Sequence, residues 1–201
     1  MIVALLNQRH RVGKTTLALH LADVGACQQR DAVIGADPQG CALEWSEMQA
    51  QEPLPRRFTV IGLTRNTLHR EAPDIARDVD RVKLDRPSDI TALTRSALLI
   101  ADLIVVPVQL PPSVRAAFVE TLRLVNEAHT FRPQLRIRVV LKRCDVRAGD
   151  ALEIARALAN SDPPALTSCI GQRSVLADAV VAGSPRSLPK SKGSCHDDPR
   201  S

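Results

Sequence analysis

The chain begins MIVALLNQRHRVGKTTLALHLA, residues 1–22, and this stretch decides the fold. Residues 2–6 are apolar and predict a strand, whereas residues 14–26 have the periodicity of a helix. The sequence Gly-Lys-Thr-Thr at the start of that helix is the core of a phosphate-binding loop, in which backbone N–H groups and a helix N-terminus face phosphate oxygens. In such loops the lysine reaches the outer phosphates and the first threonine is a ligand of Mg²⁺. The spacing therefore predicts a phosphate site formed by Gly13, Lys14, Thr15 and Thr16.

Strand-length apolar runs alternate with helical segments along most of the chain. The strands are expected at residues 2–6, 32–36, 58–62, 82–85, 103–108, 137–141 and 165–170. The helices are expected at residues 14–26, 41–49, 67–77, 89–101, 114–128 and 150–160. Strand–helix–strand units with short connections form right-handed crossovers between parallel strands. The pattern predicts the α/β class, with a single doubly wound, mostly parallel sheet of about seven strands flanked by helices.

Composition limits the classes of protein that this chain can represent. One domain accounts for residues 1–183, and the polar, Pro- and Ser-rich residues 184–201 are expected to form a disordered tail. Only 2% of the residues are aromatic, which argues against a protein that stacks single-stranded bases on rings. The apolar run 97–108 is interrupted by Asp102 and is shorter than the roughly 20 residues of a membrane span. The five cysteines form no CxxC pair, so we expect a reducing cytoplasm and no zinc site.

Acidic residues follow two of the expected strands. Asp37 comes directly after the second strand, and Asp85 ends the fourth strand as a Walker-B carboxylate does. Since ligands of a doubly wound sheet bind at the carboxyl ends of its strands, both acids are candidate ligands of Mg²⁺ beside the phosphate loop. Two alternatives stay open. Asp37 would otherwise be a turn or N-cap residue before helix 41–49, and Asp85 a residue of a strand-ending turn.

The chain carries a formal net charge of +5, and most of its basic residues are arginines. One interpretation is a solvated, arginine-rich surface, and the other is a weak, sequence-independent affinity for phosphate backbones. Basic residues concentrate in RPQLRIRVVLKR, residues 132–143. If the chain binds DNA, we expect Arg136, Arg138 and Arg143 to contribute to that binding.

The chain resembles the ParA family of partition ATPases, which have a deviant Walker-A loop. The resemblance lies in five segments that follow one another along the chain: VGKTTLALHLA, ADPQGCALEW, TLHREAPDIA, the Asp85 strand and ADLIVVPVQ. The resemblance covers residues 1–183 and is closest to the short members from plasmids and mobile elements. It implies binding of ATP and Mg²⁺, a homodimer, non-specific DNA binding in the cytoplasm or on the nucleoid, and no membrane partner. It also implies a centromere-binding adaptor protein that stimulates hydrolysis and so moves plasmid or mobile-element DNA.

The resemblance also implies roles for single residues. Lys14 and Thr15 hold phosphate and Mg²⁺ in the family, and Asp37, the acid of the DPQ motif, helps to activate the attacking water. Arg9 stands where the family has a lysine that reaches across the dimer interface to the partner's nucleotide. The resemblance therefore marks Lys14, Asp37 and Arg9 as catalytic candidates.

This sequence departs from the family pattern around the nucleotide. His10 and Arg11 replace two loop glycines, and a Cβ there obstructs positive φ and close approach of the backbone to phosphate. Further departures are Gly35 for the first acid of the DxDPQ motif, Arg86 for the glycine after the Walker-B acid, and Lys142 for an adenine-recognising asparagine. Two functional hypotheses follow: a partition ATPase, or a hydrolysis-deficient paralogue that acts as a non-catalytic, DNA-associated or dimerising protein. Iron–sulfur and membrane-targeted branches of the superfamily are disfavoured, because loop cysteines and an amphipathic C-terminal helix are absent from the sequence.

Overall fold

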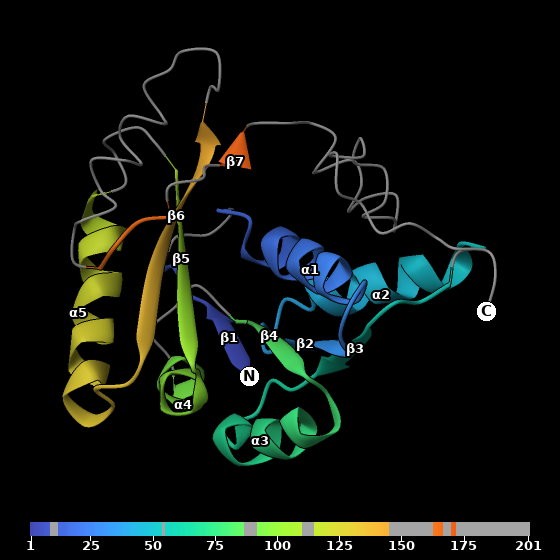
Figure 1. The fold of residues 1–201 in the computed structure, drawn as a ribbon, viewed down its shortest axis with the longest axis horizontal. Coiled ribbons are helices and arrows are strands. Elements are labelled where there is room, and N and C mark those ends of the chain that lie inside the picture. The colour runs from blue at the N-terminus through green and yellow to red at the C-terminus, as the bar shows by residue number, and fades with distance from the viewer. Residues whose placement is uncertain are drawn as a thin grey trace.

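A computed structural model of the chain describes residues 1–8, 12–53, 55–86, 92–109, 115–144, 163–166 and 170–171. Seven strands form one sheet in the order β3-β2-β4-β1-β5-β6-β7, and the paired strands are parallel (Figure 1). The strands are β1 Ile2–Leu5, β2 Asp31–Gly35, β3 Thr59–Gly62, β4 Arg81–Asp85, β5 Leu103–Gln109, β6 Arg136–Cys144 and β7 Ile170–Gly171. The helices are α1 Lys14–Gly25, α2 Cys41–Gln51, α3 Leu68–Asp78, α4 Ala92–Ile100 and α5 Arg115–Phe131.

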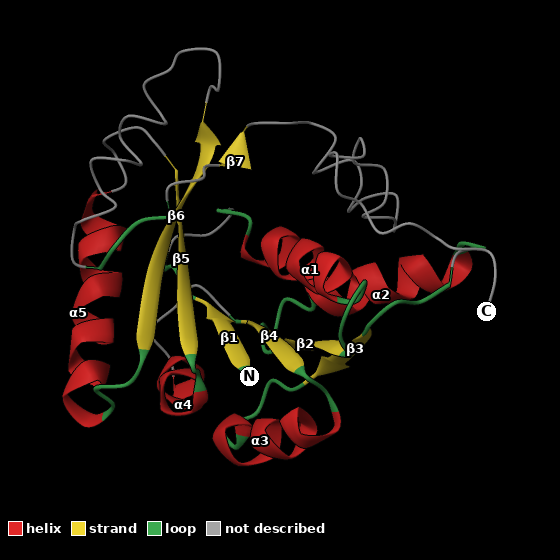
Figure 2. Cartoon of the chain, in the orientation of Figure 1, coloured by secondary structure: helices red, strands yellow, loops and turns green. Residues whose placement is uncertain are grey.

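Helices cover both faces of this sheet, with α1 and α2 on one face and α3, α4 and α5 on the other (Figure 2). Alternation along β1 shows how the two cores form, because successive side chains of a strand point to opposite faces. Ile2 and Ala4 belong to the core beneath α3, α4 and α5, whereas Val3 and Leu5 belong to the core beneath α1 and α2. The predicted α/β class, with a single parallel sheet flanked by helices, is therefore confirmed.

The core beneath α1 and α2 contains the one tryptophan of the chain. Trp45 is 1% exposed and stacks on Phe58 with ring centroids 5.3 Å apart. An aromatic pair at this distance adds about 0.5–1.5 kcal/mol beyond its buried area. The stack anchors α2 to the segment that leads into β3.

The carboxyl-terminal part of the sheet differs in detail from the expected strand 165–170. Ala165 makes an isolated parallel bridge with Val139, and β7 itself consists of Ile170–Gly171. The pairing of β6 with β7 shifts register between Lys142 and Cys144, so the edge of the sheet is irregular. The expected helix 150–160 and the expected tail 184–201 lie outside the described residues. No helix in the described part of the chain is both long enough and apolar enough to cross a membrane.

Candidate functional site

Three central strands end side by side at one edge of the sheet. The register pairs Leu5 of β1 with Asp85 of β4, and Asp85 in turn with Gly35 of β2. Beyond β2, the backbone N–H of Ala36 donates to the carbonyl oxygen of Asp85 at 2.6 Å. Because β1 leads into the loop before α1, Asp85 lies one strand away from that loop, as expected for the carboxyl edge of a doubly wound sheet.

Gly13 ends the loop and precedes the first residue of α1. Its φ of 75° and ψ of 40° lie in the left-handed region, which glycine enters without steric cost. Among the described residues, no side chain caps this helix end. The first N–H groups of a helix have no acceptor within the helix, so the N-terminus of α1 presents donors suited to an anion.

Lys14 is only 7% exposed, and its Nζ donates to the carbonyl oxygen of Asn7 at 3.1 Å. Asn7 is fully buried, and its Nδ2 donates to the carbonyl oxygen of Pro107 in β5 at 2.8 Å. These two hydrogen bonds tie the start of the loop to β5 and place the lysine amine at the Asn7 carbonyl. Arg9, His10 and Arg11 lie outside the described residues.

Asp85 is the most unusual group at this edge. Its side chain is buried, with 1% of the residue exposed, and neither carboxylate oxygen has a hydrogen-bond partner of standard geometry among the described residues. Burial raises the pKa of Asp85 to about 6, and the charge of Asp37 adds to this effect; the Thr15 hydroxyl and the charges of Lys14 and Arg86 lower it. Because the pKa stays above its ordinary value, these groups offset only part of the cost of burying the charged carboxylate.

The donor set at Asp85 fits a small divalent cation. Mg²⁺ is typically held by one or two carboxylates and by substrate phosphates rather than by a complete protein cage. In keeping with this, the described residues contain no group of three or more His, Cys, Asp and Glu side chains that could hold a metal ion alone. Thr15 lies in the first turn of α1 and influences Asp85, so hydroxyl and carboxylate oxygens are available together.

Asp37 follows β2 and is partly exposed. Its Oδ1 accepts a hydrogen bond from the backbone N–H of Gln39 at 2.9 Å, and its carbonyl oxygen accepts one from Gly40. The N-cap of α2 is Gly40, with φ 73°, so the N-cap alternative for Asp37 is wrong and the turn alternative describes its local geometry. Asp37 nevertheless stands close enough to raise the pKa of Asp85.

Two basic residues at this edge have positions that the sequence did not predict. Arg86 directly follows Asp85 and is 1% exposed, and its buried positive charge lowers the pKa of Asp85. Lys142, near the end of β6, is 8% exposed, and its Nζ donates to the carbonyl oxygen of Gly13 at 3.0 Å. The sequence marks both residues as departures from the family pattern, but it does not show that Lys142 reaches the loop, which depends on strand register and side-chain length.

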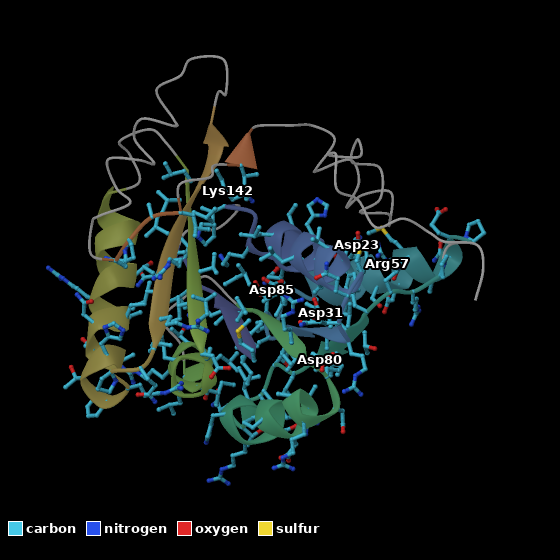
Figure 3. All side chains as sticks on the ribbon, viewed as in Figure 1. Asp23, Asp31, Arg57, Asp80, Asp85 and Lys142 are labelled. Atoms are coloured by element: carbon cyan, nitrogen blue, oxygen red, sulfur yellow. The ribbon has the colours of Figure 1, made fainter. Side chains whose placement is uncertain are left out.

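A second buried charge cluster lies at the opposite edge, where β2 and β4 begin. Lys83 Nζ contacts Asp31 Oδ2 at 2.5 Å, and Arg81 Nε lies 3.5 Å from Asp31 Oδ1. Burial lowers the pKa of Lys83, which the contact with Asp31 opposes. In the view of Figure 3, Asp85 lies between Lys142 and this cluster. We assign the Asp31 cluster to the packing of the sheet.

A strand, a loop ending in Gly-Lys-Thr, a helix and a buried acid on the neighbouring parallel strand together define the class of P-loop nucleotide-binding proteins. Comparison with known proteins narrows this class. No sequence model of a known family matches the chain. Individual relatives do match it over most of its length.

The chain is 32% identical over 180 residues to "Maintenance of carboxysome distribution protein A" of Gloeobacter kilaueensis, which covers 84% of this chain and 76% of the relative. It is 29% identical over 169 residues to "Chromosome-partitioning ATPase Soj" of Thermus thermophilus, covering 69% of this chain and 67% of that protein. The chain belongs to the ParA family of P-loop partition ATPases.

Solved structures agree on the fold. A plasmid partition protein from Borrelia burgdorferi B31, solved with bound AMPPNP, superposes with a TM-score of 0.71 at 15% identity. The match covers 96% of this chain and 93% of that one. At this identity the likeness establishes the shared architecture of the sheet and its helices.

Proposed function

We propose that this chain binds Mg²⁺ and ATP at the carboxyl edge of its sheet and works as a ParA-type partition protein. The observation that carries the proposal is Asp85, a buried carboxylate without a hydrogen-bond partner of standard geometry among the described residues, one strand from the loop that ends in Gly13. The charges of Lys14 and Arg86 offset the burial of this carboxylate only in part, so a bound divalent cation would stabilise its charged form further. The phosphate loop provides the matching anion site.

In this proposal Gly13, Lys14, Thr15 and Thr16 bind the phosphates. The Mg²⁺ ligands come from Thr15 and Asp85, with Asp37 beside them. Asp37, Lys14 and Arg9 would act in hydrolysis, by the resemblance to the family. Nucleotide binding would then support a homodimer.

We further propose that the dimer binds DNA without sequence preference and positions a cargo through an adaptor protein. The names of the two relatives point to different cargoes, carboxysomes for one and a chromosome for the other. For this chain a plasmid or mobile element remains our proposal, with the nucleoid in the cytoplasm as the place of action. Arg136 is exposed and Arg138 is partly exposed on β6, where both are available to phosphate backbones.

A second candidate function is a relative that binds nucleotide but hydrolyses it slowly or not at all. The specific observation in its favour is the substitution of side chains for loop glycines at His10 and Arg11. The buried Arg86 beside Asp85 points in the same direction, because a fixed guanidinium there alters the electrostatics in which a reacting water would be placed.

Calorimetric titration of the full chain with ATP tests nucleotide binding, with and without Mg²⁺. We expect binding that requires Mg²⁺ and that Lys14→Ala abolishes. Arg77→Gln is the matched control, since it removes one positive charge from an exposed ion pair with Asp74 on α3. If the unmodified chain binds no ATP, or if Lys14→Ala binds ATP as well as the unmodified chain does, the proposal is wrong. Phosphate release from the same preparations then separates the two candidate functions.

A further inference from the structure

We infer that Lys142 is a second phosphate-binding cation of this site, which makes the chain a receptor for polyphosphates whose affinity rises steeply with the number of phosphate groups. The inference rests on the proposed nucleotide function and deepens it. It concerns a residue from β6, on the other side of the loop from the β4 acid, and it assigns that residue a ligand contact.

The position of the Lys142 amine is defined by its contact with the loop. Its Nζ donates to the carbonyl oxygen of Gly13 at 3.0 Å, and the same carbonyl accepts the N–H of Leu17 in the first turn of α1 at 3.0 Å. The ammonium group therefore sits beside the first turn of α1. This is the end of the helix whose free N–H groups attract anions.

Gly13 and Lys142 fit each other closely. A Cβ built on Gly13 would lie 2.3 Å from Lys142 Nζ, far inside the contact distance of two such atoms. The missing side chain at Gly13 thus serves two purposes, because it permits the left-handed backbone and leaves room for the amine. With 8% of the residue exposed, Lys142 is held in a built site rather than projecting into solvent.

Two lysine amines consequently bracket the loop. Lys14 Nζ bonds to the carbonyl oxygen of Asn7 at its start, and Lys142 Nζ bonds to the carbonyl oxygen of Gly13 at its end. Both amines are buried, where attraction between opposite charges is stronger than in water. Each ammonium group already makes a charge-assisted hydrogen bond to a carbonyl oxygen. A phosphate oxygen in place of that carbonyl would add the attraction between two opposite charges.

The ligand class follows from this arrangement. A single phosphate group engages the helix N-terminus and one amine, whereas a chain of two or three phosphates is long enough to engage both amines. Removal of the charge at residue 142 should therefore weaken binding of a long phosphate chain more than binding of a short one. A role confined to packing would weaken both equally.

The experiment compares tripolyphosphate, pyrophosphate and orthophosphate as probes, titrated calorimetrically into the full chain at several salt concentrations. The test variant is Lys142→Gln, which keeps an N–H donor for the Gly13 carbonyl and removes the charge. Arg77→Gln removes one exposed charge from α3 and is the control for net charge. We expect Lys142→Gln to bind tripolyphosphate about tenfold more weakly, or worse, with a smaller loss for orthophosphate and a weaker dependence on salt.

The inference is overturned if Lys142→Gln binds tripolyphosphate as tightly as the unmodified chain does, or if it loses the same factor for all three probes. If the unmodified chain binds neither ATP nor tripolyphosphate, the proposed function itself fails. Lys142→Arg, which keeps the positive charge, gives a second test. It should lose less affinity for tripolyphosphate than Lys142→Gln does, and an equal loss in the two variants contradicts the inference.

Discussion

Replacement of Asp85 by asparagine should favour the folded chain more at neutral pH than in acid. The pKa of Asp85 stands at about 6 instead of the ordinary 3.8, chiefly because the carboxyl is buried. In the unfolded chain the carboxyl loses its proton near its ordinary pKa, whereas in the folded chain it keeps the proton up to about pH 6. Between these values the folded state binds more protons than the unfolded state, so the free energy of unfolding falls as the pH rises.

The size of this effect follows from the same two pKa values. The rise from 3.8 to about 6 corresponds to about 3 kcal/mol, because one pKa unit is worth about 1.4 kcal/mol. The penalty is absent below about pH 4, grows between about pH 4 and pH 6, and is fully present above that. The asparagine side chain of the Asp85→Asn variant carries no charge anywhere in this range. Any cost of burying its amide is independent of pH and cancels when the two pH values are compared.

Urea unfolding of the unmodified chain and Asp85→Asn at pH 4 and pH 8 measures this difference. We expect the stability of the variant relative to the unmodified chain to rise by about 3 kcal/mol from the lower to the higher pH. Asp80→Asn is a control of opposite sign, and its change is measured between about pH 2 and pH 4. The backbone N–H of Arg30 donates to the Asp80 carboxylate at 2.8 Å and holds its pKa below the ordinary value, so that carboxylate stabilises the fold above about pH 4 and stops doing so in acid. The reasoning is refuted if the difference in free energy of unfolding between Asp85→Asn and the unmodified chain is the same at pH 4 and pH 8.

Three further outcomes are expected. The double variant His10→Gly, Arg11→Gly should raise ATP turnover more than ATP affinity, because backbone donors near phosphate stabilise the transition state. A rate of phosphate release equal to that of the unmodified chain contradicts this prediction. The double variant Arg136→Gln, Arg138→Gln should bind DNA more weakly than the unmodified chain at low salt, and its affinity in gel shifts should depend less on salt concentration. If the affinity of the unmodified chain for DNA does not change with salt concentration, phosphate contacts do not drive the binding. Gly25→Ala should lower the free energy of unfolding by about 1–3 kcal/mol or more, because its Cβ would lie 1.8 Å from Asp31 Oδ2; a thermal midpoint equal to that of the unmodified chain would rule this out.

The order of strands and helices could be predicted because each strand is a short apolar run and each helix has its own periodicity. Residues 103–108 illustrate this, since a strand buried on both faces needs apolar residues throughout. The convergence of the phosphate loop and Asp85 followed from one rule, that parallel strands end at a common edge. Such inferences depend on the hydrophobicity and spacing of residues that are close together in the sequence.

Contacts between distant residues could not be predicted in this way. Lys83 lies between the apolar residues Val82 and Leu84 of β4. Only the pairing of β2 with β4 shows that its partner is Asp31, at the start of β2. Lys142 likewise follows an apolar run, and the reach of its side chain to Gly13 depends on register across the sheet. Sequence periodicity gives the face on which a side chain lies but not the atoms that it meets.

The energetics of Asp85 bear on the choice between an active ATPase and a relative that only binds nucleotide. Ionisation of the buried Asp85 carboxyl lowers the stability of the folded chain by about 3 kcal/mol at neutral pH. Many single substitutions would remove this cost. A chain that had lost its ligand would gain stability from any of them. Asp85 is nevertheless present, together with Lys14 and Lys142 on either side of the loop. The departures at His10 and Arg11 instead affect backbone donors, whose placement matters most in the transition state. The combination favours a protein that still binds its nucleotide and turns it over slowly.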